Sequence, residues 1–172
     1  MRHLLTLSAL ALGFILVGPQ VRAAPLAVGD SAPCVVLNNV AANGSESEHC
    51  IRDPEVAGQA KILEFFSATC GDCTENLPIV SQLAARVKAE ATTRLVGIDR
   101  SESVMRDFIK NNHQLINFDV ALDMNREAKR AYDIVETPTI FVLDAHNKVL
   151  YRSAGVLSAA EVEQIVGLVG GH

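Results

Sequence analysis

Two cysteines separated by only two residues constrain this chain more than any other feature. The tetrapeptide Cys70-Gly71-Asp72-Cys73 follows the apolar run at residues 62–66 and precedes a stretch in which apolar residues recur at helical spacing. A thiol at a helix N-terminus meets unpaired backbone N–H groups and the positive end of the helix dipole, which stabilise a thiolate. A second thiol one turn later can close a disulfide with it. The spacing therefore predicts dithiol redox chemistry at a strand-to-helix junction.

The N-terminus is typical of a secretory signal sequence. A basic start precedes an apolar run over residues 4–17, and residues 21–23 (Val-Arg-Ala) suit signal peptidase. The apolar run is short for a membrane span, which needs about 20 residues. We therefore expect residues 1–23 to be a signal peptide and residues 24–172 to form a single exported domain. An uncleaved membrane anchor is the disfavoured alternative.

The charge of the chain excludes some classes of partner. The full sequence has 15 basic and 20 acidic residues, and removal of Arg2 and Arg22 with the signal peptide leaves 13 and 20, a net charge of −7. This balance argues against nucleic acid and against anionic membrane surfaces as partners. Four cysteines in an exported protein are expected to pair, or to cycle, in an oxidising compartment.

The hydrophobic pattern predicts an α/β domain that begins with a β-hairpin. Strands are expected at residues 32–38, 46–51, 61–66, 94–99, 118–122, 139–143 and 149–153. Helices are expected at residues 73–90, 103–112, 126–132 and 158–169. Ser101 and Ser158 are placed to cap two of these helices, and Glu161 completes a capping box with Ser158. The order of strand, helix and strand after the hairpin is typical of a parallel βαβ unit.

Four motifs occur along the chain in order. They are Gly-Asp-Ser-Ala-Pro at residues 29–33, Phe-Phe-Ser-Ala-Thr-Cys-Gly-Asp-Cys at residues 65–73, Pro78, and Thr-Pro-Thr at residues 137–139. In these motifs the chain resembles the thioredoxin-like superfamily and, within it, the exported TlpA/ResA-type thiol-disulfide oxidoreductases. The resemblance extends roughly over residues 28–169, nearly the whole exported domain.

The resemblance implies a thioredoxin-like fold. Such a fold has a central mixed β-sheet flanked by helices, here with an N-terminal β-hairpin extension and a helix–strand insert between its two halves, for which residues 101–122 are the candidate. It also implies a cis peptide bond before Pro138. The chain departs from the family pattern at Thr69, where thioredoxins usually have Trp, and at Asn76, where several TlpA/ResA-type reductases have Glu. These departures leave the substrate class and the acid–base details open.

The two cysteines of the motif are expected to have different roles. Cys70 precedes the helix, so its sulfur should be exposed and should attack the substrate, whereas Cys73 should resolve the mixed disulfide. Asp72 places a negative charge near the Cys70 sulfur, which favours the oxidised form of the pair and hence a reductant. Because the dithiol is itself the electron carrier, no cofactor is expected. A permanently closed disulfide and a pair of metal ligands are the alternatives.

Glu64 interrupts a strand that should be buried on both faces. Burial would raise its pKa towards neutrality, where a general base is useful. Glu64 lies six residues before Cys70, where thioredoxin has a buried Asp, so the resemblance implies that it accepts a proton from Cys73 during resolution. The alternative is a Glu paired with Lys61 or facing solvent at the end of the sheet.

Thr137 and Pro138 are the candidate substrate-binding residues. By resemblance, Pro138 packs beside the dithiol and discourages metal binding by the two sulfurs. The backbone of Thr137 is then left available to pair with an extended segment of the substrate. The alternative is an ordinary trans proline in a turn.

Cys34 and Cys50 lie on the two strands of the expected hairpin. A loop at residues 41–43 would place them directly opposite each other, whereas a two-residue turn at residues 43–44 would place Cys50 opposite Leu37. We favour a structural disulfide between Cys34 and Cys50. A second redox pair and free thiols are the other possibilities.

The sequence therefore predicts an exported, periplasmic thiol-disulfide oxidoreductase that reduces disulfides in other exported proteins. The resemblance implies that a membrane dithiol donor supplies the electrons and that targets include apocytochromes, in cytochrome c biogenesis, or copper-site assembly proteins. A monomer is the default expectation.

Two other functions stay open at this point. A copper metallochaperone would use the same two thiols, since soft thiolates select Cu(I), although the motif has no nearby Met or His. A peroxiredoxin-like thiol peroxidase would use Cys73-Thr74-Glu75, although Cys70 falls where that family does not expect a resolving thiol.

Overall fold

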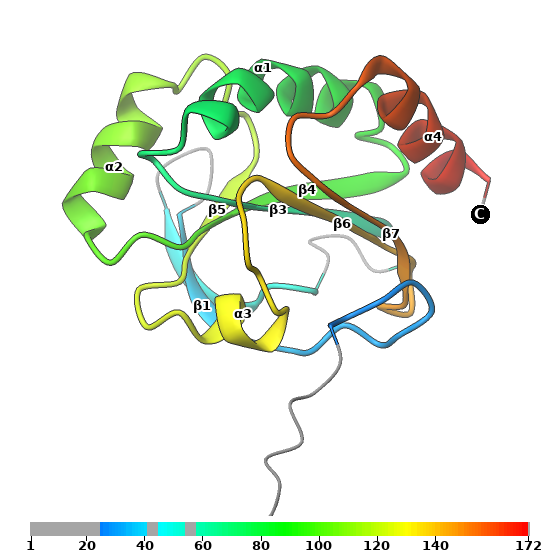
Figure 1. Cartoon of the computed structure of the whole chain (residues 1–172), viewed down its shortest axis with the longest axis horizontal. Helices are drawn as coiled ribbons and strands as arrows, with labels where there is room; N and C mark the ends of the chain where they lie inside the picture. The colour runs from blue at the N-terminus through cyan, green and yellow to red at the C-terminus, as the bar shows by residue number, and fades with distance from the viewer. Residues whose placement is uncertain (1–24, 41–44, 54–57, 172) are drawn as a thin grey trace, which may run out of the picture.

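The structure is a computed structural model of the chain, and it describes residues 25–40, 45–53 and 58–171. Its core is one β-sheet with helices on both faces (Figure 1). The expected signal peptide, residues 1–23, and the hairpin loop at residues 41–44 lie outside the described residues.

Seven strands of the described residues form the sheet, in the order β2-β1-β5-β4-β3-β6-β7. Their bounds are β1 Val36–Val40, β2 Glu46–Cys50, β3 Ala60–Phe66, β4 Ala91–Gly97, β5 Asp119–Leu122, β6 Thr139–Leu143 and β7 Val149–Ala154. Strands β3, β4 and β5 are parallel to one another, and the other neighbouring pairs are antiparallel. The sheet is therefore mixed, as the resemblance implied.

In the part of the chain that the structure describes, four helices cover the sheet, namely α1 Gly71–Arg86, α2 Glu102–Asn111, α3 Glu127–Ala131 and α4 Ala159–Gly170. Helices α1, α2 and α4 lie on one face and α3 lies on the other (Figure 1). The capping predictions are confirmed, because Ser101 accepts from the N–H of Val104 and Ser158 forms a capping box with Glu161. Among the described residues, no helix is long and apolar enough to cross a membrane.

Strand β3 lies between two apolar cores. Ile62 and Phe66 belong to the core on the α1 side, whereas Leu63 and Phe65 belong to the core on the α3 side. Successive side chains of a strand point to opposite faces of the sheet, so the even-numbered residues of β3 face α1. Glu64 therefore points into the core beneath α1, within a strand in which every residue is buried.

The expected helix–strand insert is present between the two halves of the sheet. Residues 101–122 contain the cap and body of α2 and strand β5. Strand β5 pairs in parallel with β4 and antiparallel with β1. The insert therefore connects the N-terminal hairpin to the central strands.

Some element boundaries differ from the prediction. Helix α1 begins at Gly71 instead of residue 73, because Cys70 already serves as its N-cap. Strand β4 begins at Ala91 instead of residue 94, because the polar segment that follows Ala91 pairs with the start of β3. Local hydrophobicity does not indicate where such a strand begins, because the pairing depends on a neighbouring strand.

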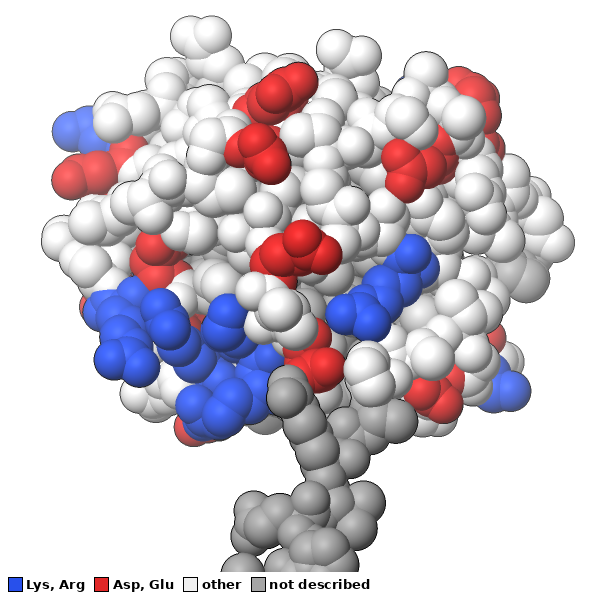
Figure 2. Space-filling model, in the orientation of Figure 1, with Lys and Arg blue, Asp and Glu red and all other residues white. Residues whose placement is uncertain are grey.

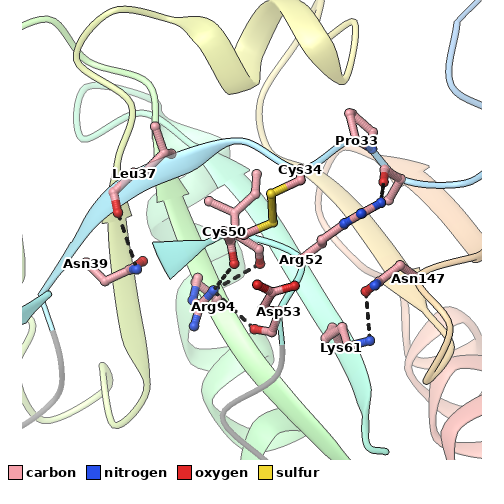
Figure 3. Close-up of a disulfide and its surroundings, with 12 residues drawn as sticks. Pro33, Cys34, Leu37, Asn39, Cys50, Arg52, Asp53, Lys61, Arg94 and Asn147 are labelled. Atoms are coloured by element: carbon pink, nitrogen blue, oxygen red, sulfur yellow. Dashed lines mark hydrogen bonds between the residues drawn. A yellow bond between two sulfur atoms is a disulfide. The ribbon is translucent and has the colours of Figure 1, made fainter. Parts of the chain in front are cut away.

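The hairpin register differs from both alternatives considered. Val36 lies opposite Cys50, and Leu37 lies opposite His49. A directly opposite cysteine pair and a pairing of Cys50 with Leu37 are therefore both wrong. Cys34 precedes β1 by two residues, on the same side as Val36, and reaches Cys50 diagonally. The predicted disulfide is nevertheless present, with a Cα–Cα distance of 5.4 Å (Figure 3).

Two arginines hold the hairpin close to this disulfide. Arg94, buried in β4, donates from Nη1 to the carbonyl oxygens of Cys50 at 3.2 Å and Ile51 at 3.0 Å (Figure 3). Arg52 donates from Nη1 to the carbonyl oxygen of Ala32. These bonds to backbone carbonyls do not need the disulfide, so the hairpin is held in more than one way.

The Cys34→Ser/Cys50→Ser double variant should fold and should lose about 3 kcal/mol of unfolding free energy, because the disulfide closes a loop of 16 residues in the unfolded chain. Urea denaturation followed by circular dichroism measures this loss. The matched control is Cys70→Ser/Cys73→Ser, which removes two thiols that form no disulfide in this structure. Equal stability of the wild type and the Cys34/Cys50 variant would contradict a structural role for the disulfide.

Candidate active site

The tetrapeptide of residues 70–73 lies where β3 leads into α1. Strand β3 ends at Phe66, and Cys70 is the N-cap of α1, with an extended backbone. The backbone N–H of Cys73 donates to Cys70 Sγ at 3.2 Å, so the sulfur takes the place that a capping oxygen usually has. The predicted strand-to-helix junction is confirmed. A helix N-terminus favours negative charge on an atom in this position.

The second thiol of the motif is in a different environment. Cys73 is 2% exposed, whereas Cys70 is only partly buried, and neither is in a disulfide. Burial raises the pKa of the Cys73 thiol to about 12, and its hydrogen bond with Cys70 acts in the same direction. Cys73 therefore keeps its proton at neutral pH unless a base removes it.

A cis peptide bond joins Thr137 to Pro138, as the resemblance implied. The Cys70 thiol donates to the carbonyl oxygen of Thr137 at 3.3 Å, which places this loop beside the dithiol. The loop is tied down by Thr139, whose Oγ1 donates to the carbonyl oxygen of Glu136 at 2.7 Å. Thr137 and Cys70, predicted from motifs 67 residues apart, are therefore in contact.

Glu64 is buried, with only 1% of its surface exposed. Its Oε1 accepts from Asn76 Nδ2 at 3.0 Å, and within the described residues its Oε2 has no hydrogen-bond partner. Burial raises the pKa of Glu64 to about 7, and the bond from Asn76 offsets part of that rise. The expected shift towards neutrality is confirmed.

The alternative pairing of Glu64 with Lys61 is wrong. Lys61 has an odd-numbered position in β3 and therefore faces away from α1. Its Nζ donates to the carbonyl oxygen of Asp144 at 2.9 Å and to Asn147 Oδ1 at 2.8 Å (Figure 3). Burial lowers the pKa of this amine.

Asn76 is a site residue whose role the sequence analysis missed. It is fully buried in α1, and its Oδ1 accepts from the backbone N–H of Leu157 at 2.9 Å. Asn76 follows Cys73 by three residues, so both side chains lie on the same face of the helix. The sequence feature that could have indicated this role is a polar residue on an otherwise apolar face of the helix.

Asp99 is a second residue that the sequence analysis passed over. Its Oδ1 accepts from Ser67 Oγ at 2.8 Å and its Oδ2 accepts from the N–H of Ala68 at 2.8 Å. Strands β3 and β4 are parallel, so their carboxyl ends lie at the same edge of the sheet, and Asp99 follows β4 by two residues. Asp99 therefore holds the connection between β3 and Cys70.

Charge is unevenly distributed over the face that Figure 1 presents. Lys and Arg side chains gather around α3, low on the left of the view, whereas Asp and Glu side chains are scattered over the rest (Figure 2). Helix α3 itself contributes Lys129 and Arg130. Such asymmetry biases the orientation in which a charged partner approaches.

Comparison with known proteins agrees with this geometry. The Redoxin family model matches residues 27–167. The chain belongs to the Redoxin family. The thiol-disulfide oxidoreductase ResA of Bacillus subtilis (strain 168) is 25% identical over 142 residues, which cover 82% of this chain and 75% of ResA.

Solved structures place this Redoxin family member among thioredoxin-like proteins. A Chlorobium tepidum protein assigned as the thiol:disulfide interchange protein DsbE matches with a TM-score of 0.70 and 27% identity, over 84% of this chain and 98% of that one. The 2-Cys peroxiredoxin of Plasmodium vivax also has a TM-score of 0.70, over 84% of this chain and 97% of its own, but at 14% identity it shows the fold alone. The chain is thus a thiol-disulfide oxidoreductase of the thioredoxin-like TlpA/ResA type.

The buried carboxyl group should make stability depend on pH. The pKa of Glu64 is raised by folding from 4.5 to about 7, so its favourable contribution is complete below pH 4.5 and is lost as the pH rises to about 7. Glu64→Gln removes this loss. The variant should therefore be more stable than the wild type by about 3 kcal/mol at pH 8 and nearly equal at pH 4.

Urea denaturation of the two proteins at pH values from 4 to 8 measures this difference. Glu75→Gln is the control, because Glu75 is an exposed carboxylate in α1. A constant difference between the wild type and Glu64→Gln across this range would show that Glu64 does not titrate as a buried acid.

Proposed function

We propose that this oxidoreductase is an exported protein that reduces disulfides in other exported proteins through Cys70 and Cys73. The observation that carries the proposal is the asymmetry of the two sulfurs. Cys70, the N-cap of α1, is partly exposed, while Cys73 is buried and its raised pKa keeps it protonated at neutral pH. One accessible sulfur and one protected sulfur are what attack and resolution require.

The reaction begins with the Cys70 thiolate attacking one sulfur of a substrate disulfide. The substrate S–S bond breaks, its second sulfur leaves with the electron pair and takes up a proton, and a mixed disulfide forms at Cys70. Glu64 then accepts the proton of Cys73, whose thiolate attacks Cys70 Sγ. The second substrate thiol is released. The protein's dithiol has then been oxidised by two electrons to the Cys70–Cys73 disulfide.

Substrate is bound through the loop that contains the cis bond. Within the described part of the chain, the N–H of Thr137 has no hydrogen-bond partner, and Pro138, which follows it, is buried. A substrate segment in extended conformation pairs with this backbone, as in strand-addition recognition. Its disulfide is then presented beside Cys70, which contacts Thr137.

Export and partners follow from the N-terminal sequence and from the family resemblance. Residues 1–23 act as the signal peptide, and the exported domain, residues 24–172, works as a periplasmic monomer. A membrane dithiol donor returns the Cys70–Cys73 disulfide to the reduced form. Apocytochromes and copper-site assembly proteins are the proposed targets.

The other two functions have less support. A Cu(I) site made by the two thiols needs both as thiolates, whereas burial raises the pKa of Cys73. The peroxiredoxin likeness is confined to the fold. Neither alternative uses the contact between Cys70 and the Thr137 carbonyl group.

The redox midpoint of the dithiol tests the direction of electron flow. In a Cys34→Ala/Cys50→Ala background, thiol alkylation after equilibration in dithiothreitol buffers should give a midpoint near that of thioredoxin, about −270 mV. A midpoint near −120 mV, roughly that of a strong oxidant, would reverse the assigned direction. A pair that does not cycle, together with a stoichiometric complex in a Cu(I) titration, would replace the oxidoreductase role by metal binding.

Single cysteine variants test the division of roles. Cys70→Ser should abolish insulin reduction, because the nucleophile is lost. Cys73→Ser should accumulate a mixed disulfide with insulin, detectable by non-reducing electrophoresis, since nothing resolves it. Accumulation in Cys70→Ser instead would exchange the two roles.

A further inference from the structure

A buried polar chain connects three elements beneath the dithiol. Glu64 in β3 accepts from Asn76 in α1, and Asn76 accepts from the backbone N–H of Leu157, two residues before α4. Glu64 is 1% exposed, Asn76 is 0% exposed and Leu157 is 3% exposed. Buried polar groups of this kind are costly unless they are hydrogen-bonded, so the chain has a strongly preferred arrangement.

The orientation of the Asn76 amide is determined by its two neighbours. The N–H of Leu157 can only donate, so it must face the amide oxygen, at 2.9 Å. The amide nitrogen then faces Glu64 Oε1, at 3.0 Å. If the amide were flipped, its NH2 group would face the N–H of Leu157, and its oxygen would face Glu64 Oε1.

This orientation makes the two oxygens of Glu64 unequal. Oε1 accepts from Asn76 whether the carboxyl group is charged or neutral, because the second oxygen can hold the proton in the neutral form. Oε2 is buried and has no hydrogen-bond partner among the described residues. Proton uptake at Oε2 therefore leaves the bond between Glu64 and Asn76 intact.

Within the described structure, the surroundings of Glu64 offer one other titratable group on α1. In the sheet, Glu64 lies between Leu95 of β4 and Ile140 of β6, which are both apolar. From α1, Cys73 belongs to the same core, one turn before Asn76. Glu64, whose position in β3 also faces this core, is therefore the candidate acceptor for a proton that leaves this thiol.

Charged and phenolic groups of the neighbouring strands are engaged elsewhere. Lys61 and Arg94 lie at positions whose side chains point to the face of the sheet opposite Glu64. Tyr151 of β7 packs against the α1-side core, but its hydroxyl donates to Glu161 at 2.9 Å. Burial is the main cause of the raised pKa of Glu64, and the hydrogen bond from Asn76 acts in the opposite direction.

We propose that Asn76 is a positioning residue that leaves only one oxygen of Glu64 available to accept a proton from the dithiol. Its amide, locked by the N–H of Leu157, occupies Oε1 and leaves Oε2 to take the proton from Cys73. The Cys73 thiolate then attacks Cys70 Sγ, and the substrate sulfur leaves with the electron pair. This inference rests on the proposed function, because it assigns the resolution step to Cys73.

The first measurement follows Glu64 without any redox reaction. Carbon-13 NMR of the side-chain carboxyl carbon gives the titration midpoint of Glu64 in the reduced wild type and in Asn76→Ala. Losing the N–H donor removes a bond that favours the carboxylate, so the midpoint should rise by about one pH unit. An unchanged midpoint overturns the proposal.

The second measurement is the rate at which a preformed mixed disulfide at Cys70 is resolved, as a function of pH. In Asn76→Ala the rate should fall several-fold at pH 7 and recover to within about twofold of the wild type at high pH, where Glu64 is ionised in both proteins. A merely structural role would lower the rate equally at every pH and would overturn the proposal.

A double-mutant cycle tests whether Asn76 acts through Glu64. In a Glu64→Gln background, Asn76→Ala should have no further effect on the resolution rate, since the titrating group is absent. An equal effect in both backgrounds overturns the proposal. If the dithiol of the wild type never cycles, the proposed function itself is wrong. The NMR titration needs no redox reaction, so it still tests the role of Asn76 separately.

The isosteric variant Asn76→Asp covers the case in which Asn76→Ala does not fold. It places a second carboxyl group against Glu64, so two coupled titration steps should replace the single one. Asn112→Asp is the matched control, because Asn112 lies outside this core, at the C-cap of α2. A single unshifted step in Asn76→Asp overturns the proposal.

Discussion

The burial of β3 on both faces is the constraint on which the rest of this structure depends. The strand pairs with β4 and β6, and its side chains enter two separate apolar cores. Because β3 is held so completely, its end positions Cys70 at the start of α1. The same burial removes water from Glu64, which is why the pKa of this carboxyl group is raised towards neutrality.

Desolvation also separates the two sulfurs. Cys70 accepts a backbone N–H and contacts the carbonyl oxygen of Thr137 at the edge of the core, while Cys73 lies inside it. The pKa values of Cys73 and Glu64 are raised by the same cause. The proposed exchange needs one sulfur that the substrate can reach and a second that stays buried until resolution. The boundary of the hydrophobic core lies between the two.

The hairpin illustrates how far sequence patterns reach. Two cysteines on neighbouring strands indicated a disulfide, and the disulfide is present. The predicted register was wrong. Strand β1 also pairs with β5, where Asn39 lies opposite Ala121, so the hairpin turn is not the only constraint on β1. That second partner is about eighty residues away along the chain, so no turn sequence within the hairpin contains the information.

The sequence by itself determined which groups are candidates for the chemistry. They are a dithiol at a strand-to-helix junction, a carboxyl group in an apolar strand and a proline motif, with the order of strands and helices around them. These features depend on neighbouring residues, and periodicity and spacing report them directly. Only the tertiary structure decided which polar groups meet, as with Asn76 between Glu64 and Leu157, or Asp99 against Ser67. The contact between Asn76 and Leu157 joins residues 81 apart along the chain. Such contacts form because strand pairing and helix packing bring buried donors and acceptors together.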